Sequence, residues 1–140
     1  MNFMPFDEFA KTEEYKKFIK ENSAIGQLKV MAFTAYQAVP IENAEIIITK
    51  DIENNKVIFF RGYTDSSGII DHIDLPAPPS GYNINDFNIN NYTLYNLTAI
   101  AKNYNTIKQY TIAMFGGLKI IQYVKMIPQV DIGGKVNGNN

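Results

Sequence analysis

The sequence predicts a mainly β fold, a seven-stranded antiparallel sandwich preceded by one N-terminal α-helix. Helix-forming residues and closely spaced charges gather before Gly26, and after it the apolar pattern changes from a helical to a two-residue period. Turn-forming residues then recur about every ten residues between short β-branched runs, as in a sandwich of about seven strands.

The composition is that of one globular domain of 140 residues, with 46% hydrophobic and 19% charged residues. Its formal net charge of −1 leaves no basic excess for binding nucleic acid. The chain has no cysteine and a single histidine, His72, which excludes disulfide frameworks, cysteine-based metal sites and sites with two imidazoles. We therefore expect neither a metal nor a cofactor.

The first residues have neither the positive flank nor the apolar stretch of about 7–15 residues that mark a secretory signal. No apolar run approaches the roughly 20 residues of a membrane-spanning helix. The chain is therefore expected to stay in the compartment of its synthesis, the cytoplasm by default, without inserting into a membrane.

Residues 7–22 are expected to form one helix of three to four turns. Asp7 can cap it, apolar residues follow at three- and four-residue steps, and Gly26 ends the segment. Its apolar edge needs cover, either from the strands of this chain, which we prefer, or from another protein. The expected organisation is a helical extension over 1–25, a β-sandwich over 26–130 and a flexible polar tail over 131–140.

The first strand is expected from Leu28 until Pro40 interrupts the pattern. The other six strands are expected at 45–50, 57–63, 69–75, 92–102, 106–115 and 118–127. The longest loop, rich in asparagine, follows the prolines that begin at Pro76. The Gly116-Gly117 pair is typical of a two-residue hairpin turn, which predicts that the last two strands pair with each other.

Four short motifs between residues 26 and 99 have a characteristic spacing. They are Gly26-x-Leu28-x-Val30, Pro40-Ile41-x-x-Ala44-x-Ile46-x-Ile48, Thr64-Asp65-x-x-Gly68 and Tyr95-x-Leu97-x-Ala99. With this pattern the chain resembles, over about residues 26–128, the carboxypeptidase regulatory-like domain, a transthyretin-like and Ig-like β-sandwich. Where that family often has Gly-Tyr after the last motif, the chain has Lys102-Asn103-Tyr104.

The sequences around residues 75–78 and 126–128 are similar to the version of this domain in clostridial spore and cortex-lytic proteins. There the domain accompanies enzymes that act on peptidoglycan and is not itself the catalyst. The resemblance therefore implies a bacterial, non-catalytic module whose partner is a protein or a peptidoglycan component, with spore or cell-wall association. The motif residues also have structural explanations, since proline suits a strand edge and Asp and Gly suit a tight turn. These fold-motif residues are Pro40, Ala44, Thr64, Asp65 and Gly68.

Two polar clusters are candidates for chemistry. Two-residue alternation places His72 and Asp74 on one face of a strand and Asp71 on the other. Such a pair can act as a general base or supply two metal ligands, but a solvent-facing strand end is our preferred interpretation. Asp65 with Ser66 and Ser67 could bind calcium or provide a nucleophile, and we prefer a turn whose side chains cap their own backbone.

Aromatic residues near many asparagines form a candidate binding surface. Planar rings and amide groups suit a sugar, although alternating tyrosines on a strand also suit packing. The candidates are Tyr82, Phe87, Tyr92, Tyr95 and Tyr104. The expected function is a non-catalytic binding or positioning module. The alternatives are a self-assembling coat- or tail-like protein that pairs exposed strand edges, which makes an oligomer possible, and a small hydrolase or metal enzyme using His72 with Asp71 and Asp74.

Overall fold

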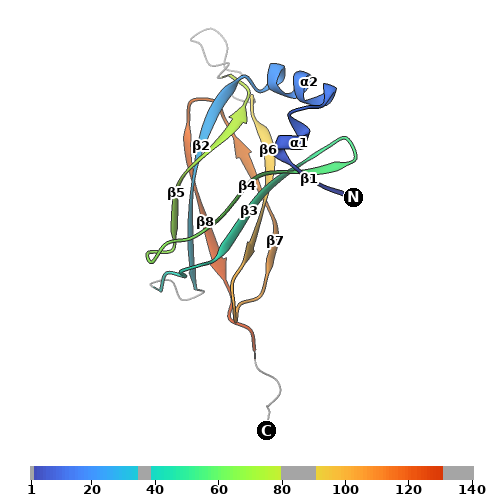
Figure 1. The fold of residues 1–140 in the computed structure, drawn as a ribbon. Helices are drawn as coiled ribbons and strands as arrows, with labels where there is room; N and C mark the ends of the chain where they lie inside the picture. The colour runs from blue at the N-terminus through green and yellow to red at the C-terminus, as the bar shows by residue number, and fades with distance from the viewer. Residues whose placement is uncertain (1, 35–38, 80–90, 131–140) are drawn as a thin grey trace.

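The structure, a computed structural model, describes residues 2–34, 39–79 and 91–130 (Figure 1). This part of the chain is mainly β, as predicted. It contains two short helices, α1 (Phe6–Phe9) and α2 (Glu13–Glu21). The strands are β1 (Asn2–Pro5), β2 (Ala24–Thr34), β3 (Glu45–Ile52), β4 (Asn55–Tyr63), β5 (Ile69–Ala77), β6 (Thr93–Ile100), β7 (Ile107–Met114) and β8 (Lys119–Met126). The expected tail over 131–140 lies outside the described residues.

The strands form two open sheets, of five strands in the order β1-β4-β3-β6-β7 and of three in the order β5-β2-β8. Both sheets are mixed, because β1 runs parallel to β4 and β2 runs parallel to β8, while the other pairs are antiparallel. The prediction of wholly antiparallel sheets is therefore wrong. The N-terminal segment adds an unexpected strand beside β4, and the last strand joins the sheet opposite the one that its predecessor occupies.

The link from β7 to β8 crosses between the sheets and does not close the hairpin predicted at residues 116–117. At Gly116 the backbone passes so close to its neighbours that a side chain cannot fit. The Gly116 amide donates to the Pro78 carbonyl at 3.1 Å, and a Cβ on Gly116 would clash with that same carbonyl oxygen. A Cβ on Gly26 would lie 2.6 Å from the Phe115 carbonyl oxygen. These glycines serve close backbone contact between the two sheets.

The single helix expected over residues 7–22 is divided into two. The side chain of Thr12 accepts a hydrogen bond from the Tyr15 amide at 3.2 Å and so starts α2 afresh after the single turn of α1. Asn22 follows the end of α2, and Gly26 lies inside β2, so it does not end the helix. Neither helix within the described ranges has the length and apolar composition needed to cross a membrane.

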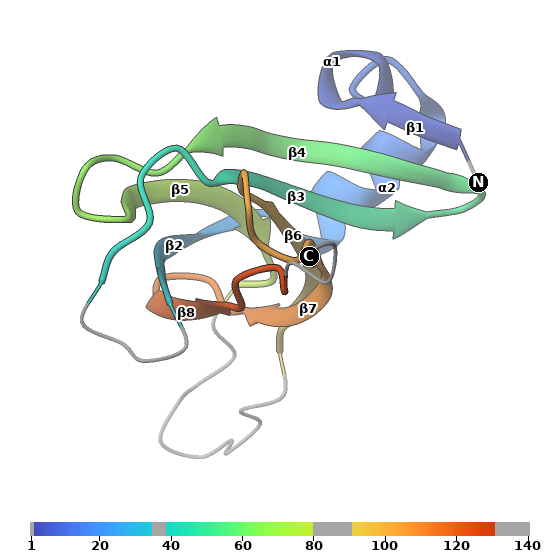
Figure 2. The ribbon, with the colours of Figure 1, turned by 90° about the horizontal axis from the view of Figure 1, so that it is seen from below.

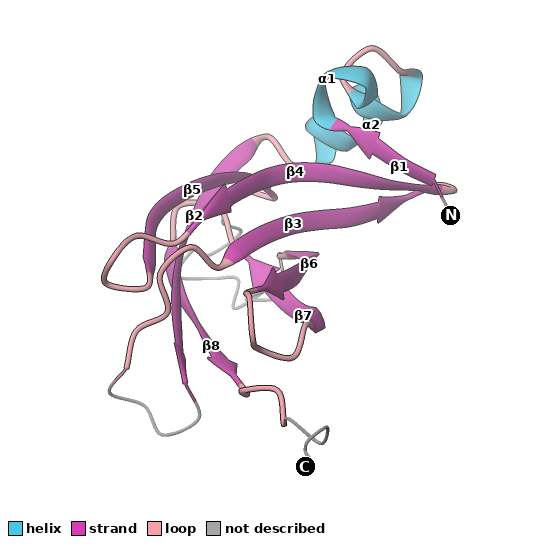
Figure 3. Cartoon of the chain, turned by 60° about the horizontal axis from the view of Figure 1, so that its bottom comes forward, coloured by secondary structure: helices cyan, strands magenta, loops and turns pink. Residues whose placement is uncertain are grey.

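The two helices pack on β4 of the same chain, which is the preferred of the two predicted arrangements. Phe9, Phe18 and Val57 are buried together and form what we call the aromatic cluster. The ring of Phe59 lies 5.5 Å from that of Phe18 and 5.1 Å from that of Tyr95, between centroids, and so joins this cluster to the main core. Figures 2 and 3 show α1 beside β1 at one edge of the five-stranded sheet, and Figure 2 shows α2 reaching from there past β4 towards β3.

The main core lies between the two sheets and takes side chains from both. Leu28 on β2 and Leu75 on β5 are fully buried, as are Ile48 on β3 and Leu97 on β6. Alternate residues of these strands point away from the core, which matches the two-residue period of the sequence. β5 continues through Pro76 and ends two residues beyond the predicted end, because an edge strand tolerates a missing amide.

Candidate functional site

The fold-motif residues meet where the segment before β3 lies against the end of β4, and there they support the backbone. The Thr64 hydroxyl donates to the Ile41 carbonyl at 2.6 Å and accepts from the Ala44 amide at 2.9 Å. Thr64 is only 2% exposed and Ala44 is fully buried. Pro40 forms an isolated bridge with Phe33 of β2. These residues hold turns in place and are not arranged around a ligand.

Asp65 closes the turn between β4 and β5. One oxygen of its carboxylate accepts from the Ser67 amide at 2.8 Å and from the Ile69 amide at 3.0 Å. Gly68 has a φ of 76°, and a Cβ there would clash with the Ala32 carbonyl oxygen. This geometry is that of the preferred interpretation, a turn whose Asp caps its own backbone through Oδ1.

His72 and Asp74 contact each other on β5, as the two-residue alternation predicts. The distance from His72 Nε2 to Asp74 Oδ1 is 2.7 Å, and both side chains are about half-exposed. β5 is an edge strand of the three-stranded sheet. A half-exposed pair on an open edge lacks the water-excluding surroundings of most active sites.

Asp71 does not complete a cluster with His72. A register shift between β2 and β5 interrupts the alternation, so the Asp71 side chain is 72% exposed although Ile73 is buried. Its carboxylate lies 3.8 Å from Lys29 Nζ and 3.9 Å from Lys119 Nζ. Within the described ranges, no three His, Asp or Glu side chains converge as a metal site requires.

The three candidate aromatic residues within the described ranges, Tyr92, Tyr95 and Tyr104, do not form a common binding surface. Tyr95 is 0% exposed, its hydroxyl donates to the Pro76 carbonyl at 2.5 Å, and burial raises the pKa of its phenol. Tyr92 precedes β6 and Tyr104 follows it, so the eight residues of that strand, roughly 26 Å, separate them. Proposing Tyr95 as a binding residue was wrong because core packing uses it. Tyr82 and Phe87 lie outside the described residues.

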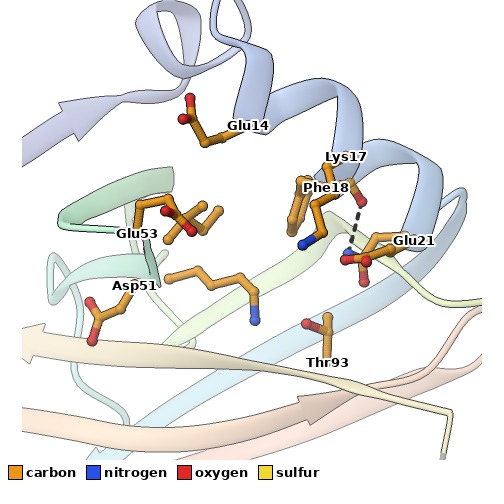
Figure 4. A pocket seen from close by; sticks show the side chains of 10 residues that line it. Glu14, Lys17, Phe18, Glu21, Asp51, Glu53 and Thr93 are labelled. Carbon is orange, nitrogen blue, oxygen red and sulfur yellow. Dashed lines mark hydrogen bonds between the residues drawn. The ribbon is translucent and has the colours of Figure 1, made fainter.

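A cavity of about 330 Å³ lies between α2, the β3–β4 hairpin and the start of β6 (Figure 4). We call it the α2 cavity. Phe18 and Ile52 form apolar parts of its lining, and Thr93 supplies a hydroxyl from β6. Four carboxylates and two ammonium groups complete the charged part of the lining, from Glu14, Glu21, Asp51, Glu53, Lys17 and Lys50.

The local structure explains how these charges come together. Glu14, Lys17 and Glu21 recur at three- and four-residue steps and therefore share one side of α2. Asp51 is the one exposed residue of β3, and Glu53 occupies the tight turn to β4 with a φ of 55°. The sequence does not predict the cavity, because each of these charged residues, taken alone, is expected to lie on a solvent-exposed surface. The helical spacing of Glu14, Lys17 and Glu21 indicates that they share one side of the helix. It does not indicate which strands that side faces.

Lys50 contributes a partly buried ammonium group to the lining of the α2 cavity. Its Nζ donates to the Leu94 carbonyl at 2.8 Å and lies 5.4 Å from the centroid of the Tyr95 ring. Burial lowers the pKa of Lys50, and the charge of Asp51 opposes that shift only in part. No carboxylate among the described residues forms an ion pair with Lys50. Its ammonium group is therefore available to the anionic part of a ligand.

We predict that Lys50 titrates below 10.5, the ordinary pKa of lysine. Between its folded-state pKa and 10.5 the unfolded chain binds more protons at this site, so the stability contribution of Lys50 rises with pH across that window. An NMR titration that follows the lysine Cε resonances measures the pKa directly. A Lys50→Met variant should lose the rise in stability, and a Lys50 midpoint at or above 10.5 would contradict the prediction.

No protein-family model and no curated protein sequence matches the chain. Among solved structures, the Bacillus anthracis TIE protein aligns with a TM-score of 0.50 and 18% identity, over 75% of this chain and 17% of that protein. This likeness shows the β-rich fold alone. A variant of catechol 1,2 dioxygenase from Acinetobacter radioresistens aligns with a TM-score of 0.46 and 9% identity, over 93% of this chain and 58% of that one. The chain thus spans a small part of the first protein and just over half of the second.

Proposed function

We propose that the chain is a non-catalytic module that binds or positions a partner in a bacterial spore or cell-wall system. Its fold would be the transthyretin-like sandwich of carboxypeptidase regulatory-like domains. Two facing sheets and the convergence of Thr64, Ala44 and Pro40 on one set of turns support this assignment. Fold resemblance does not specify a function, so the function is argued from the site.

The observation that carries the proposal is the mixture of charges in the α2 cavity. Carboxylates from α2 and the hairpin suit an amino group, while Lys17 and Lys50 suit a carboxylate. The lining contains no imidazole, and Thr93 is its one hydroxyl-bearing side chain. This arrangement suits a zwitterionic ligand, and it lacks the pairing of a nucleophilic side chain with an imidazole base that serine-type hydrolysis uses. The ligand we propose is a short peptide, such as the peptide part of peptidoglycan.

The enzyme alternative would place chemistry at His72 with Asp71 and Asp74. His72 and Asp74 lie on an open edge strand, Asp71 contacts lysines, and none of the three lines the α2 cavity. The structure therefore favours the binding proposal over the enzyme alternative.

Self-assembly has one observation in its favour. β8 is an edge strand, and Ile121 and Tyr123 on it are exposed. However, antiparallel pairing of two copies of β8 centred on Gln122 would bring Lys119 of one copy opposite Lys125 of the other, and these like charges repel. Light scattering during size-exclusion chromatography at high concentration separates this alternative from the binding module.

The proposal predicts that the full chain is retained by purified peptidoglycan. Replacing Glu21 with lysine should reverse one carboxylate of the α2 cavity and weaken retention about tenfold, equivalent to the loss of one charge-assisted contact of about 1.4 kcal/mol. Glu13→Lys is the matched control, because Glu13 lies on the same helix, pairs with Lys16 and does not line the cavity. His72→Ala should bind as the wild type does.

A parallel pull-down from lysates of sporulating and growing cells tests the biological setting. Enrichment of neither a wall polymer nor a wall protein would remove the spore and wall proposal. Loss of an activity in His72→Ala would instead favour the enzyme alternative, and equal retention of Glu21→Lys and wild type would exclude the α2 cavity as the binding site.

A further inference from the structure

The outer face of the five-stranded sheet carries a second hollow, of about 320 Å³, which we call the outer hollow. Its apolar lining comes from Phe3, Ile47 and Ile100, and its polar lining from Thr49, Lys56, Asn96 and Thr98. The lining therefore spans four adjacent strands, from β1 across β4 and β3 to β6.

The sheet register brings these side chains together. Phe3 pairs with Lys56, Ile47 with Thr98, and Thr49 with Asn96. Since Ile46 and Ile48 are fully buried in the core, the residues between and beside them face the other way. The outer hollow thus lies across the sheet from the core and from the α2 cavity, and Thr49 and its neighbour Lys50 line different sites.

The outer hollow carries no unpaired charge among the described residues of its lining. Lys56 is the single charged residue in its lining, and Lys56 Nζ lies 3.1 Å from the Asp51 carboxylate. The remaining polar groups open to a ligand are the hydroxyl of Thr98 and the amide of Asn96, both half-buried, whereas Thr49 is only 3% exposed. A charged ligand finds no unmatched partner there, and a purely apolar ligand would cover hydroxyl and amide groups without replacing their hydrogen bonds to water.

Phe3 supplies the apolar contact. It is 67% exposed at the edge of the hollow, so its ring is open to a ligand. A flat ring beside neutral hydrogen-bonding groups matches a ligand that has an apolar face and a hydroxyl-bearing rim.

We propose that the outer hollow binds a short neutral glycan. The C–H face of a sugar ring packs against Phe3, and its hydroxyl groups exchange hydrogen bonds with Asn96 and Thr98. The proposal goes beyond the function proposed above, because it uses the opposite face of the sheet and a ligand without charge. It locates sugar binding away from the aromatic loop residues that sequence reasoning selected.

The test is an NMR titration of the ¹⁵N-labelled full chain with chitotetraose and, separately, with cellotetraose. We expect at least one of these neutral glycans to shift backbone amides of β3 and β6 around Thr49 and Thr98. Phe3→Ala should weaken binding at least about tenfold, and Thr98→Val, which removes a hydroxyl at constant shape, about fivefold.

Matched controls lie on the same face of the sheet. Tyr63→Ala removes an exposed ring from β4, and Thr111→Val removes an exposed hydroxyl from β7, and neither residue lines the hollow. Both should bind the glycan as the wild type does. Circular dichroism and melting curves verify that Phe3→Ala folds normally.

The absence of amide shifts with both glycans would overturn the proposal. Shifts confined to the α2 cavity, or equal affinity of Phe3→Ala and wild type, would also overturn it. The test is separable from that of the proposed function, which depends on Glu21: peptidoglycan retention that is lost in Glu21→Lys, without glycan shifts, would refute the outer hollow and leave the α2 cavity supported.

Discussion

Replacing Phe9 with alanine is expected to weaken the packing of the N-terminal helices on β4 by about 3–5 kcal/mol. Phe9 is 2% exposed, and its ring lies 5.6 Å from the ring of Tyr15, 5.7 Å from that of Phe18 and 6.2 Å from that of Phe59, between centroids. Alanine would leave a cavity in the centre of the aromatic cluster. This cluster is the main apolar contact that connects the helices with the sheet.

Hydrogen exchange measures this loss where it occurs. Amides of α2 should lose protection, while amides of β2 and β6, which belong to the main core, should keep most of theirs. Phe3→Ala is the control, since an exposed phenylalanine should change stability by no more than about 0.5 kcal/mol. Unchanged protection of α2 in Phe9→Ala would mean that the aromatic cluster does not hold the helices.

Replacing Thr64 with valine is expected to lower the free energy of unfolding by about 2–4 kcal/mol. Valine has nearly the same shape, but it removes the hydroxyl that serves the Ile41 carbonyl and the Ala44 amide. Two backbone groups in a buried site would then lose a hydrogen-bonding partner. Urea denaturation followed by circular dichroism measures the effect.

Two further variants make the Thr64 result specific. Thr64→Ser keeps the hydroxyl and should restore most of the lost stability. Thr111→Val removes an exposed hydroxyl from β7 and should change stability by no more than about 0.5 kcal/mol. A Thr64→Val variant as stable as Thr111→Val would show that the two hydrogen bonds contribute nothing to the fold.

The two proposed binding sites use opposite faces of one strand. Lys50 lines the α2 cavity and Thr49 lines the outer hollow, so β3 separates a charged site from a neutral one. Asp51 connects them, because it lines the α2 cavity and pairs with Lys56 of the outer hollow. Asp51→Asn should therefore be avoided as a single-site test, since it would disturb both sites together.

Local features could be predicted from the sequence because short-range forces decide them. The run of β-branched residues at 45–50 identified a strand, and Asp65 with Gly68 identified a turn. The division of the N-terminal helix at Thr12 was also readable, as a capping residue followed by two glutamates, but the apolar spacing across it favoured one continuous helix.

Tertiary structure alone decided which strands are neighbours and which charges meet. A two-residue period indicates that a strand has an apolar face. The period is the same whether the next strand pairs beside this strand or crosses to the opposite sheet, as β8 does after Gly116. Tyr95 became a core residue because the sheets close over it. Likewise, Glu21, Lys50 and Thr93 are far apart in the chain, and they share a cavity because the aromatic cluster docks α2 against β4.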